Sequence, residues 1–322
     1  MEHSLEFTWM CIIGFSFVMY IILDGFVIGI GIVCPFLNEH QRDLAFSAVL
    51  PVWDGNQTWL VCGGALLYGM FPIAFAYLMP KIYLPVILLL VLLIFRGVCF
   101  EFRLKTKKGK GFYDKLFAVS SLLIGLAHGY LAGQVIIGYE THHFATEGWG
   151  LKIMAAITLV LGYMTLGATR LMLKTEGDLF DKTRLISKRC SYLLLIFGLI
   201  CILITLLRAE VNLSFLRIII LTGIGVCCLL FFVLLQLSIN KGNDIFPYWS
   251  TVGLFVMIFL SLFIYIFPYL IPYDLKYWEA SSSETTLKFS LIPAVIMFPI
   301  LLLYTGYNYY VFRGKVKEKI SY

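Results

Sequence analysis

Nine long apolar runs, separated by charged or turn-forming clusters, dominate the pattern of this chain. A helix that spans a bilayer needs about 20 apolar residues, and an open strand edge cannot face lipid, so we expect each run to be a transmembrane helix. The alternative is eight spans, if one of the later runs is re-entrant. The predicted spans are Thr8–Val33, Val52–Leu78, Ile82–Phe102, Phe112–Ile137, Leu151–Leu173, Ser187–Leu207, Phe215–Ile239, Phe246–Ile271 and Leu287–Phe312.

The distribution of basic residues predicts how these spans are oriented. Of the 25 lysines and arginines, 17 fall in the odd-numbered connections or after the last span, and five fall in the even-numbered connections. Cytoplasmic loops carry the excess of basic residues in membrane proteins. We therefore expect the N-terminus outside and the C-terminus in the cytoplasm. This requires an odd number of spans and favours nine over eight.

Composition indicates an all-α polytopic membrane protein. The 322 residues are 60% hydrophobic and 14% charged, with a mean hydropathy of +0.89, whereas soluble domains are about a quarter charged. A cytosolic enzyme, a nucleic-acid-binding module and a disordered protein are excluded on this ground. The net charge of +6 comes from basic clusters beside apolar runs, so it is a signal of orientation.

Ionisable side chains inside or beside the predicted spans are the candidate functional residues, because charge within a membrane is costly. Asp24 lies past the midpoint of the first span, and Asp54 follows Trp53 at the start of the second. Arg96 and Glu101 lie near the end of the third span. In the predicted orientation all five share the cytoplasmic half of the membrane. Their shared depth predicts a proton path or a cytoplasm-facing ion site, in which Arg96 positions Asp54.

Each candidate also has a structural alternative. Asp54 could cap the N-terminus of its helix, and its neighbouring tryptophan could belong to the aromatic belt. Asp24 and Arg96 could form an ion pair that locks the first span to the third. Glu101 and Arg103, at a helix end, could extend to the interface. The shared depth of the set favours the functional interpretation.

Glycines at a four-residue spacing lie on two of the spans. Gly25 and Gly29 form a pair on the first, and Gly125, Gly129 and Gly133 form a longer stripe on the fourth. Such stripes let helices approach closely. We favour packing within the chain over a subunit interface.

The histidines and cysteines argue against a haem or metal ligated by this chain. Only His128 lies within a predicted span, whereas a membrane-embedded haem b uses one or two axial side chains, usually histidines. We interpret His128 as a polar contact beside the glycines, and His142 with His143 as a solvated pair in an outer loop. The eight cysteines contain no C-x-x-C or C-x-x-C-H motif, so neither a disulfide framework nor a c-type haem is expected.

Several segments resemble subunit II of the cytochrome bd-type quinol oxidases. The block W-D-G-N-Q-T-W-L at residues 53–60 is the most specific. Further similarity lies in D-G-F at 24–26, F-E-F-R at 100–103 and W-E-A-S-S-S at 278–283. The chain departs from many members at Val27, where they have a second acid, and at Gly97, where a proline often follows the arginine.

The resemblance implies a fold of two four-helix bundles, residues 1–138 and 139–272, followed by an outer loop and a peripheral ninth helix in residues 273–322. It implies a heterodimeric quinol:O2 oxidoreductase of the bacterial cytoplasmic membrane. Haems b and d and the quinol-oxidising loop then belong to subunit I. Small single-span subunits are further expected partners. Whether a structural quinone binds is left open, because the loop between the sixth and seventh spans is short.

In this family subunit II is expected to stabilise the complex and to help carry cytoplasmic protons to the oxygen-reducing haem. The resemblance assigns that polar path to Asp24, Trp53, Asp54, Arg96 and Glu101. Two other functions use the same residues. A proton-coupled secondary transporter is one, although transporters place their sites at the membrane midplane. A purely scaffolding subunit, which needs these side chains only for assembly, is the other.

Overall fold

The computed structural model describes residues 3–106, 109–139, 148–208 and 214–316, and nearly all of them are helical. Two short strands, β1 (Tyr269–Ile271) and β2 (Leu275–Lys276), form an antiparallel hairpin between the last two helices. The helices are α1 (Ser4–Leu23), α2 (Gly25–Val33), α3 (Glu39–Val49), α4 (Trp53–Met70), α5 (Pro72–Lys105), α6 (Lys110–Ile137), α8 (Trp149–Lys174), α9 (Gly177–Arg208), α10 (Phe215–Asn240), α11 (Phe246–Ile266) and α12 (Glu284–Val311), with a 3-10 turn at Cys34–Phe36.

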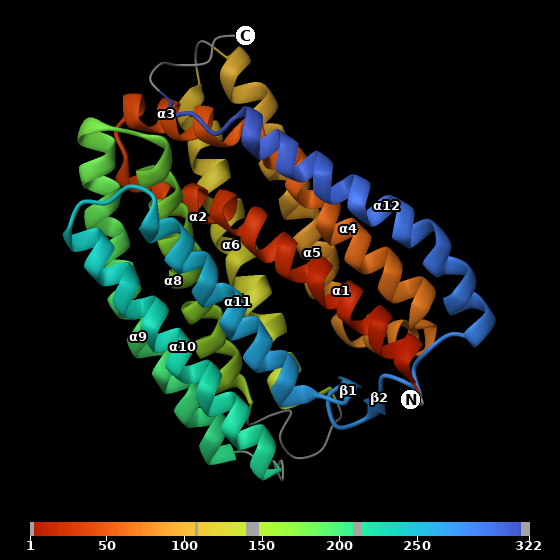
Figure 1. Cartoon of the computed structure of the whole chain (residues 1–322). Helices are drawn as coiled ribbons and strands as arrows, with labels where there is room; N and C mark the ends of the chain where they lie inside the picture. The colour runs from red at the N-terminus through yellow and green to blue at the C-terminus, as the bar shows by residue number, and fades with distance from the viewer. Residues whose placement is uncertain (1–2, 107–108, 140–147, 209–213, 317–322) are drawn as a thin grey trace.

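The long helices run roughly along one direction, and the start of α1 and the end of α12 lie at opposite ends of the molecule (Figure 1). Eight helical segments of the described residues are long and apolar enough to cross a membrane, with 4–36 counted as one. The remaining predicted span contains α4, an 18-residue helix whose first turns are polar. α4 lies against α1, α5 and α12, which places a polar helix among apolar ones.

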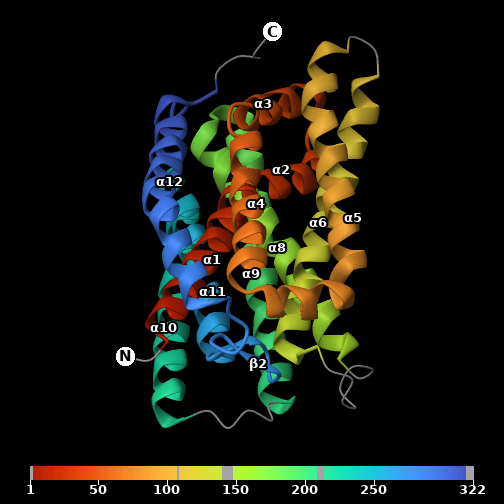
Figure 2. The ribbon, with the colours of Figure 1, turned by 90° about the vertical axis from the view of Figure 1, so that its right-hand side faces the viewer.

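The predicted boundary between the second and third spans is wrong. The second span was expected to end at Leu78, but α4 ends at Met70 and α5 begins with Pro72, where the missing N–H of proline costs no helical hydrogen bond. α5 continues through two internal prolines and Lys81. The charge of Lys81 is accommodated in the helix because its Nζ lies 3.5 Å from the ring centroid of Tyr77. The first part of α5 lies across the direction of its neighbours (Figure 2).

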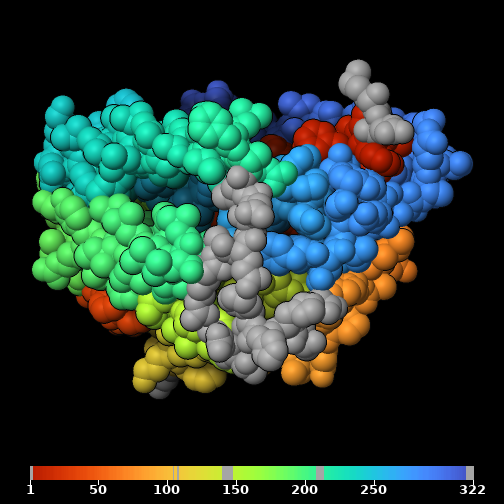
Figure 3. All heavy atoms as spheres, turned by 90° about the horizontal axis from the view of Figure 1, so that it is seen from below, coloured from red at the N-terminus to blue at the C-terminus, as the bar shows by residue number. Residues whose placement is uncertain are grey.

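Polar segments expected as loops carry structure of their own. α3 is a short helix whose capping box joins Asn38 and Gln41 through two side-chain to backbone hydrogen bonds of 2.8 and 2.9 Å. α9 begins at Gly177 rather than at Ser187, because its charged first turns lie beyond the apolar stretch and can remain helical in water. α11 ends at Ile266, and the hairpin that follows lies between the starts of α5 and α12 (Figure 3).

Backbones approach closely where α2 and α6 pack against α8. A Cβ atom on Gly29 would lie 1.7 Å from the carbonyl oxygen of Tyr163, and one on Gly129 would lie 2.4 Å from the Cα of Ala156. A Cβ atom on Gly133 would lie 2.8 Å from a further α8 Cα. These contacts join helices that precede residue 138, where the first predicted bundle ends, to a helix that follows it. The division of the chain into two bundles therefore stays a prediction.

We expect Gly29→Ala to destabilise the protein by roughly 1–3 kcal/mol, the usual cost of overpacking, because the new methyl group meets backbone atoms that cannot move aside. Gly64→Ala is the matched control, since no atom lies within 4 Å of the Cβ position there. Alanine is the better helix former by about 1 kcal/mol, so the control should be neutral or slightly stabilising. Thermal unfolding in detergent measures both. Equal loss in the two variants would contradict the close approach of α2 and α8.

Candidate functional site

A fully buried ion pair joins the α1–α2 junction to α5. Nη2 of Arg96 lies 2.7 Å from Oδ1 and 2.8 Å from Oδ2 of Asp24, and both side chains are 0% exposed. Asp24 stays within the helical hydrogen-bond pattern, since its N–H donates to the carbonyl oxygen of Tyr20 at 2.8 Å. Each charge requires the other, because an unpaired buried charge costs several kcal/mol.

Part of the Arg96 guanidinium remains available for other polar groups. Its Nε and Nη1 atoms are buried and have no hydrogen-bond partner among the described residues. Buried donors in native proteins are usually paired with protein groups or ordered water. Arg96 can therefore hold Asp24 through one nitrogen while its other donors remain available to internal water.

Two tyrosines and a histidine lie on the other side of Asp24. Nδ1 of His128 lies 3.1 Å from the hydroxyl of Tyr163, and Nε2 lies 3.4 Å from the hydroxyl of Tyr20. Cβ atoms on Gly25 and Gly125 would lie 2.6 and 3.5 Å from atoms of the Tyr163 ring, so these predicted packing glycines flank that ring. The sequence singled out the glycines and His128 but missed both tyrosines, because a tyrosine inside an apolar run carries no local signal.

A second polar group connects α12 to the α1–α4 contact. The Tyr309 hydroxyl donates to Oδ1 of Asn56 at 2.9 Å, and Nδ2 of Asn56 donates to the carbonyl oxygen of Leu23 at 2.6 Å. Arg170 of α8, buried in the chain, lies with Cζ 5.0 Å from the Tyr248 ring centroid and 5.3 Å from the Tyr309 ring centroid. The carbonyl of Leu23 immediately precedes Asp24, so this group ends beside the ion pair.

The remaining predicted site residues lie farther out. Trp53 stacks on Phe100 with ring centroids 5.0 Å apart. Asp54 is exposed in the first turn of α4, where Val52 occupies the N-cap position, so Asp54 is not the cap residue. Glu101 is exposed and pairs with Lys105 at 3.3 Å.

The structure therefore corrects one expectation about the site. Arg96 binds Asp24 and does not position Asp54. The Arg96 side chain reaches Asp24 at the α1–α2 junction, whereas Asp54 is exposed in the first turn of α4.

The interpretation of Arg103 as an interfacial side chain is wrong. Arg103 is 0% exposed and binds two carboxylates, with Nε 2.5 Å from Asp114 and Nη1 2.8 Å from Asp43. Arg42 adds a contact of 3.1 Å to Asp114, and Lys110 lies 3.5 Å from Asp43. This network joins α3, α5 and α6 at the end of the molecule where α12 finishes.

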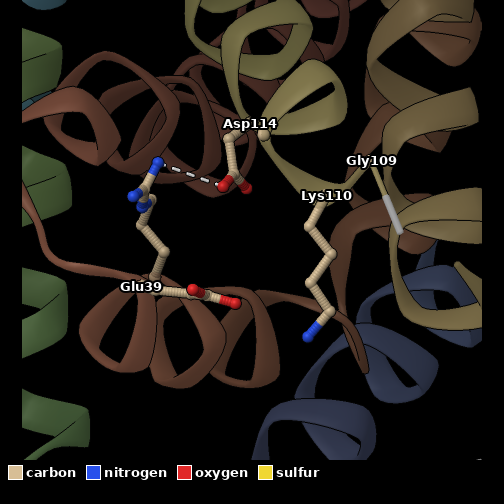
Figure 4. Close-up of a pocket in the computed structure, with 6 residues that line it drawn as sticks. Glu39, Gly109, Lys110 and Asp114 are labelled. Atoms are coloured by element: carbon tan, nitrogen blue, oxygen red, sulfur yellow. Dashed lines mark ion pairs between the residues drawn. The ribbon is translucent and has the colours of Figure 1, made fainter. Parts of the chain in front are cut away.

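A cavity of about 260 Å³ opens beside this network (Figure 4). The side chains of Glu39, Lys110 and Asp114 surround the opening, and a dashed line marks the ion pair of Arg42 with Asp114. The lining has both signs of charge, so it favours neither anions nor cations.

The described histidines do not form an axial ligand set for a haem. Both ring nitrogens of His128 lie opposite tyrosine hydroxyls, His3 stacks on a tryptophan, and His40 is exposed on α3. Among the described residues, no group of three or more His, Cys, Asp or Glu side chains is arranged to hold a metal ion. The predicted pair His142 and His143 lies outside the described residues.

We expect Arg103→Gln to destabilise the protein by about 3–5 kcal/mol, because it leaves two buried carboxylates without their arginine. Arg42→Gln is the matched control, since its side chain is 27% exposed and contacts one of the same carboxylates. The loss of Arg42 should cost less, about 1 kcal/mol, because this side chain is partly in contact with solvent and Asp114 keeps Arg103. Chemical denaturation in detergent compares the two variants. A cost for Arg103→Gln no larger than that of the control would contradict a buried network.

Comparison with known proteins gives one consistent family. Residues 5–312 match the sequence model of a family described as cytochrome bd terminal oxidase subunit II. The cytochrome bd-I ubiquinol oxidase subunit 2 of Escherichia coli (strain K12) is 26% identical over 370 residues, which cover 98% of this chain and 97% of that protein. The cytochrome bd ubiquinol oxidase subunit 2 of Bacillus subtilis (strain 168) is 28% identical over 334 residues, with 98% of each chain covered.

The fold has also been seen before. A chain in the structure of bd oxidase from Geobacillus thermodenitrificans superposes with a TM-score of 0.81, covering 94% of this chain and 97% of that chain at 18% identity.

Proposed function

The chain belongs to the cytochrome bd terminal oxidase subunit II family, and from that premise we propose that it carries cytoplasmic protons towards the oxygen-reducing haem of a partner subunit. It is a multi-pass protein of the bacterial inner membrane and a subunit of a quinol-oxidising oxidoreductase, with catalysis carried in the complex. Reduction of O2 to water consumes protons, and hydrocarbon cannot supply them. A route through polar side chains is therefore needed.

The observation that carries the proposal is the buried pair of Asp24 and Arg96. A carboxylate with no exposed surface can take up and release protons only through internal polar groups, and the neighbouring arginine holds it in place through two hydrogen bonds. α2 contains no second acid, because Val27 stands at that position. Asp24 therefore acts without the neighbouring acid that many members of the family have.

The other predicted residues form the entrance to this route. Asp54 is the entry carboxylate, since it is exposed at the start of α4. The Trp53 indole bridges this entrance and α5, because a Cβ atom on Gly97 would lie 3.4 Å from it. Glu101 collects protons at the surface one turn beyond Gly97.

We propose nine membrane crossings, with the N-terminus outside and the C-terminus in the cytoplasm. The eight apolar spans and α4 make up the nine. The start of α1 and the end of α12 lie at opposite ends of the molecule, as an odd number of crossings requires (Figure 2). The basic residues Arg42 of α3, Arg103 near the end of α5 and Lys174 at the end of α8 lie at the α12 end, in agreement with a cytoplasmic location.

The exposed face of α4 is the proposed contact with the haem-bearing subunit I. Thr58, Val61, Ala65 and Tyr68 recur at helical spacing on that face, and all four are exposed. Thr58 and Ala65 are polar or small residues, which at membrane depth are better covered by protein than by lipid, and Val61 and Tyr68 add large exposed side chains to the contact. The haems b and d and quinol oxidation are assigned to that partner. A structural quinone and small single-span subunits remain expectations from the family.

Asp24→Asn should slow quinol-driven O2 consumption by roughly a hundredfold, the lower end of what a positioned acid or base contributes. Asp54→Asn should cause a smaller loss, because water can replace an entry group. Both are measured in the assembled complex and normalised to haem content by visible spectroscopy. The control is Glu284→Gln, which alters an acid at the other end of the molecule whose side chain is 72% exposed.

Normal turnover of both aspartate variants with full haem content would contradict the proton-path proposal. Asp24 would then be only a structural partner of Arg96. If every charge variant reduces only assembly, the chain is a scaffolding subunit. Binding of a small solute by the purified chain without any partner would favour a proton-coupled transporter.

A further inference from the structure

Tyr309 of α12 is connected to the chain on both sides of Asp24. Before Asp24, the Tyr309 hydroxyl lies 2.9 Å from Oδ1 of Asn56, and Nδ2 of Asn56 lies 2.6 Å from the carbonyl oxygen of Leu23. After Asp24, the Tyr309 ring packs edge-on against Phe26, with ring centroids 6.4 Å apart. One side chain of α12 therefore meets the residues that flank the buried carboxylate.

The Leu23 carbonyl determines the polarity of this connection. A carbonyl oxygen can only accept a hydrogen bond, so the part of Asn56 that faces it must be the NH2 group. The amide oxygen of Asn56 then faces Tyr309, whose hydroxyl must donate to it. Asn56 is 1% exposed, so bulk water does not reach the amide. Without the Tyr309 hydroxyl, the Asn56 oxygen would be a buried acceptor that lacks its donor, and the present orientation of the amide would be disfavoured.

The Tyr309 ring is held in turn by a buried arginine of α8. Cζ of Arg170 lies 5.3 Å from the ring centroid of Tyr309, 5.0 Å from that of Tyr248 and 4.8 Å from that of Phe26. Arg170 is 6% exposed, and its Nε has no hydrogen-bond partner among the described residues. A guanidinium group is attracted to the faces of aromatic rings. Arg170 therefore ties the position of Tyr309 to α2, α8 and α11.

Neighbouring residues of α12 fix its register against the start of α4. Nδ2 of Asn308 donates to the carbonyl oxygen of Pro51 at 3.4 Å. A Cβ atom on Gly55 would lie 3.8 Å from the Tyr304 ring. Most side chains of α12 are exposed, so this turn is where the helix meets the polar interior.

We infer that Tyr309 is a positioning residue for Asp24 that acts through Asn56. The Tyr309 hydroxyl holds the Asn56 amide, and the amide holds the carbonyl of Leu23. The backbone at the α1–α2 junction then keeps the Asp24 carboxylate in place beside Arg96. Tyr309 transfers no proton itself. The inference rests on the proposed function of Asp24, and it gives α12 a part in proton uptake.

Tyr309→Phe tests the inference because it removes the hydroxyl and keeps the ring that packs on Phe26. O2 consumption by the assembled complex, normalised to haem content, should fall by roughly tenfold, less than the hundredfold that a misplacement of about 1 Å can cost. Tyr307→Phe is the matched control, since this tyrosine of the same helix is 69% exposed. A loss in Tyr309→Phe no larger than that in the control overturns the inference.

A second background separates positioning from a general structural role. In Asp24→Asn the carboxylate that Tyr309 positions is absent, so adding Tyr309→Phe should lower the residual turnover by less than about twofold. A structural defect independent of Asp24 would lower turnover by the same factor in both backgrounds. An equal loss in the two backgrounds therefore overturns the inference.

If Tyr309→Phe does not assemble, Asn56→Ser decides instead, because a serine side chain is too short to join Tyr309 to Leu23. It should slow turnover in the original background and leave Asp24→Asn unchanged, and an equal loss in both again overturns the inference. Failure of the proposed function gives a different result. Asp24→Asn that turns over normally refutes the proton path. Asp24→Asn that is slow, together with a Tyr309→Phe variant that behaves like the control, refutes only the positioning role.

Discussion

An arginine and an aspartate that are both withdrawn from solvent stabilise each other only while they stay within hydrogen-bonding distance. Asp24 at the α1–α2 junction and Arg96 of α5 meet this condition, with neither side chain exposed. The helices around them are therefore constrained in register as well as in distance. Asn56 donates to the carbonyl oxygen of Leu23, next to Asp24, and His128 contacts Tyr20, one helical turn before it, so these polar contacts gather near one buried charge pair.

Close backbone approach makes this polar interior possible in a small space. Gly29, Gly129 and Gly133 bring α2 and α6 against the backbone of α8, and Gly25 and Gly125 leave room for the Tyr163 ring. Without a strong hydrophobic force between helices in lipid, association depends on such packing and on hydrogen bonds between helices. The glycine stripes and the polar side chains are thus two parts of one arrangement.

The two ends of the molecule are stabilised by different chemistry. At the end where α12 finishes, Arg103 is held by Asp43 and Asp114, and Lys174 donates to carbonyl oxygens that follow α12. At the other end aromatic contacts dominate around the hairpin, where Phe267, Tyr277 and Trp278 lie against one another. A gathering of basic residues at one end is the side-dependent feature of membrane proteins, whereas aromatic residues are enriched at both interfaces.

Much of the fold could be predicted from the sequence, because the hydropathy of a segment and the position of its basic residues are local properties of the chain. A helical membrane protein, eight of the nine predicted spans and the family resemblance follow from such signals. The ends of helices were less predictable. α5 passes through Lys81 because Tyr77 lies under its ammonium group, a contact that hydropathy does not encode.

The candidate site was predictable in its residue types and only partly in its partners. Sequence alone determined that Asp24 and Arg96 are costly in a membrane and share a depth, since both conclusions need only position and helical rise. Tertiary structure decided that they bind each other, that Asp54 faces outward, and that Arg103 is enclosed. The reason is physical: a buried charge takes the partner that helix packing brings within about 3 Å, and that choice depends on helix rotation and tilt rather than on order along the chain.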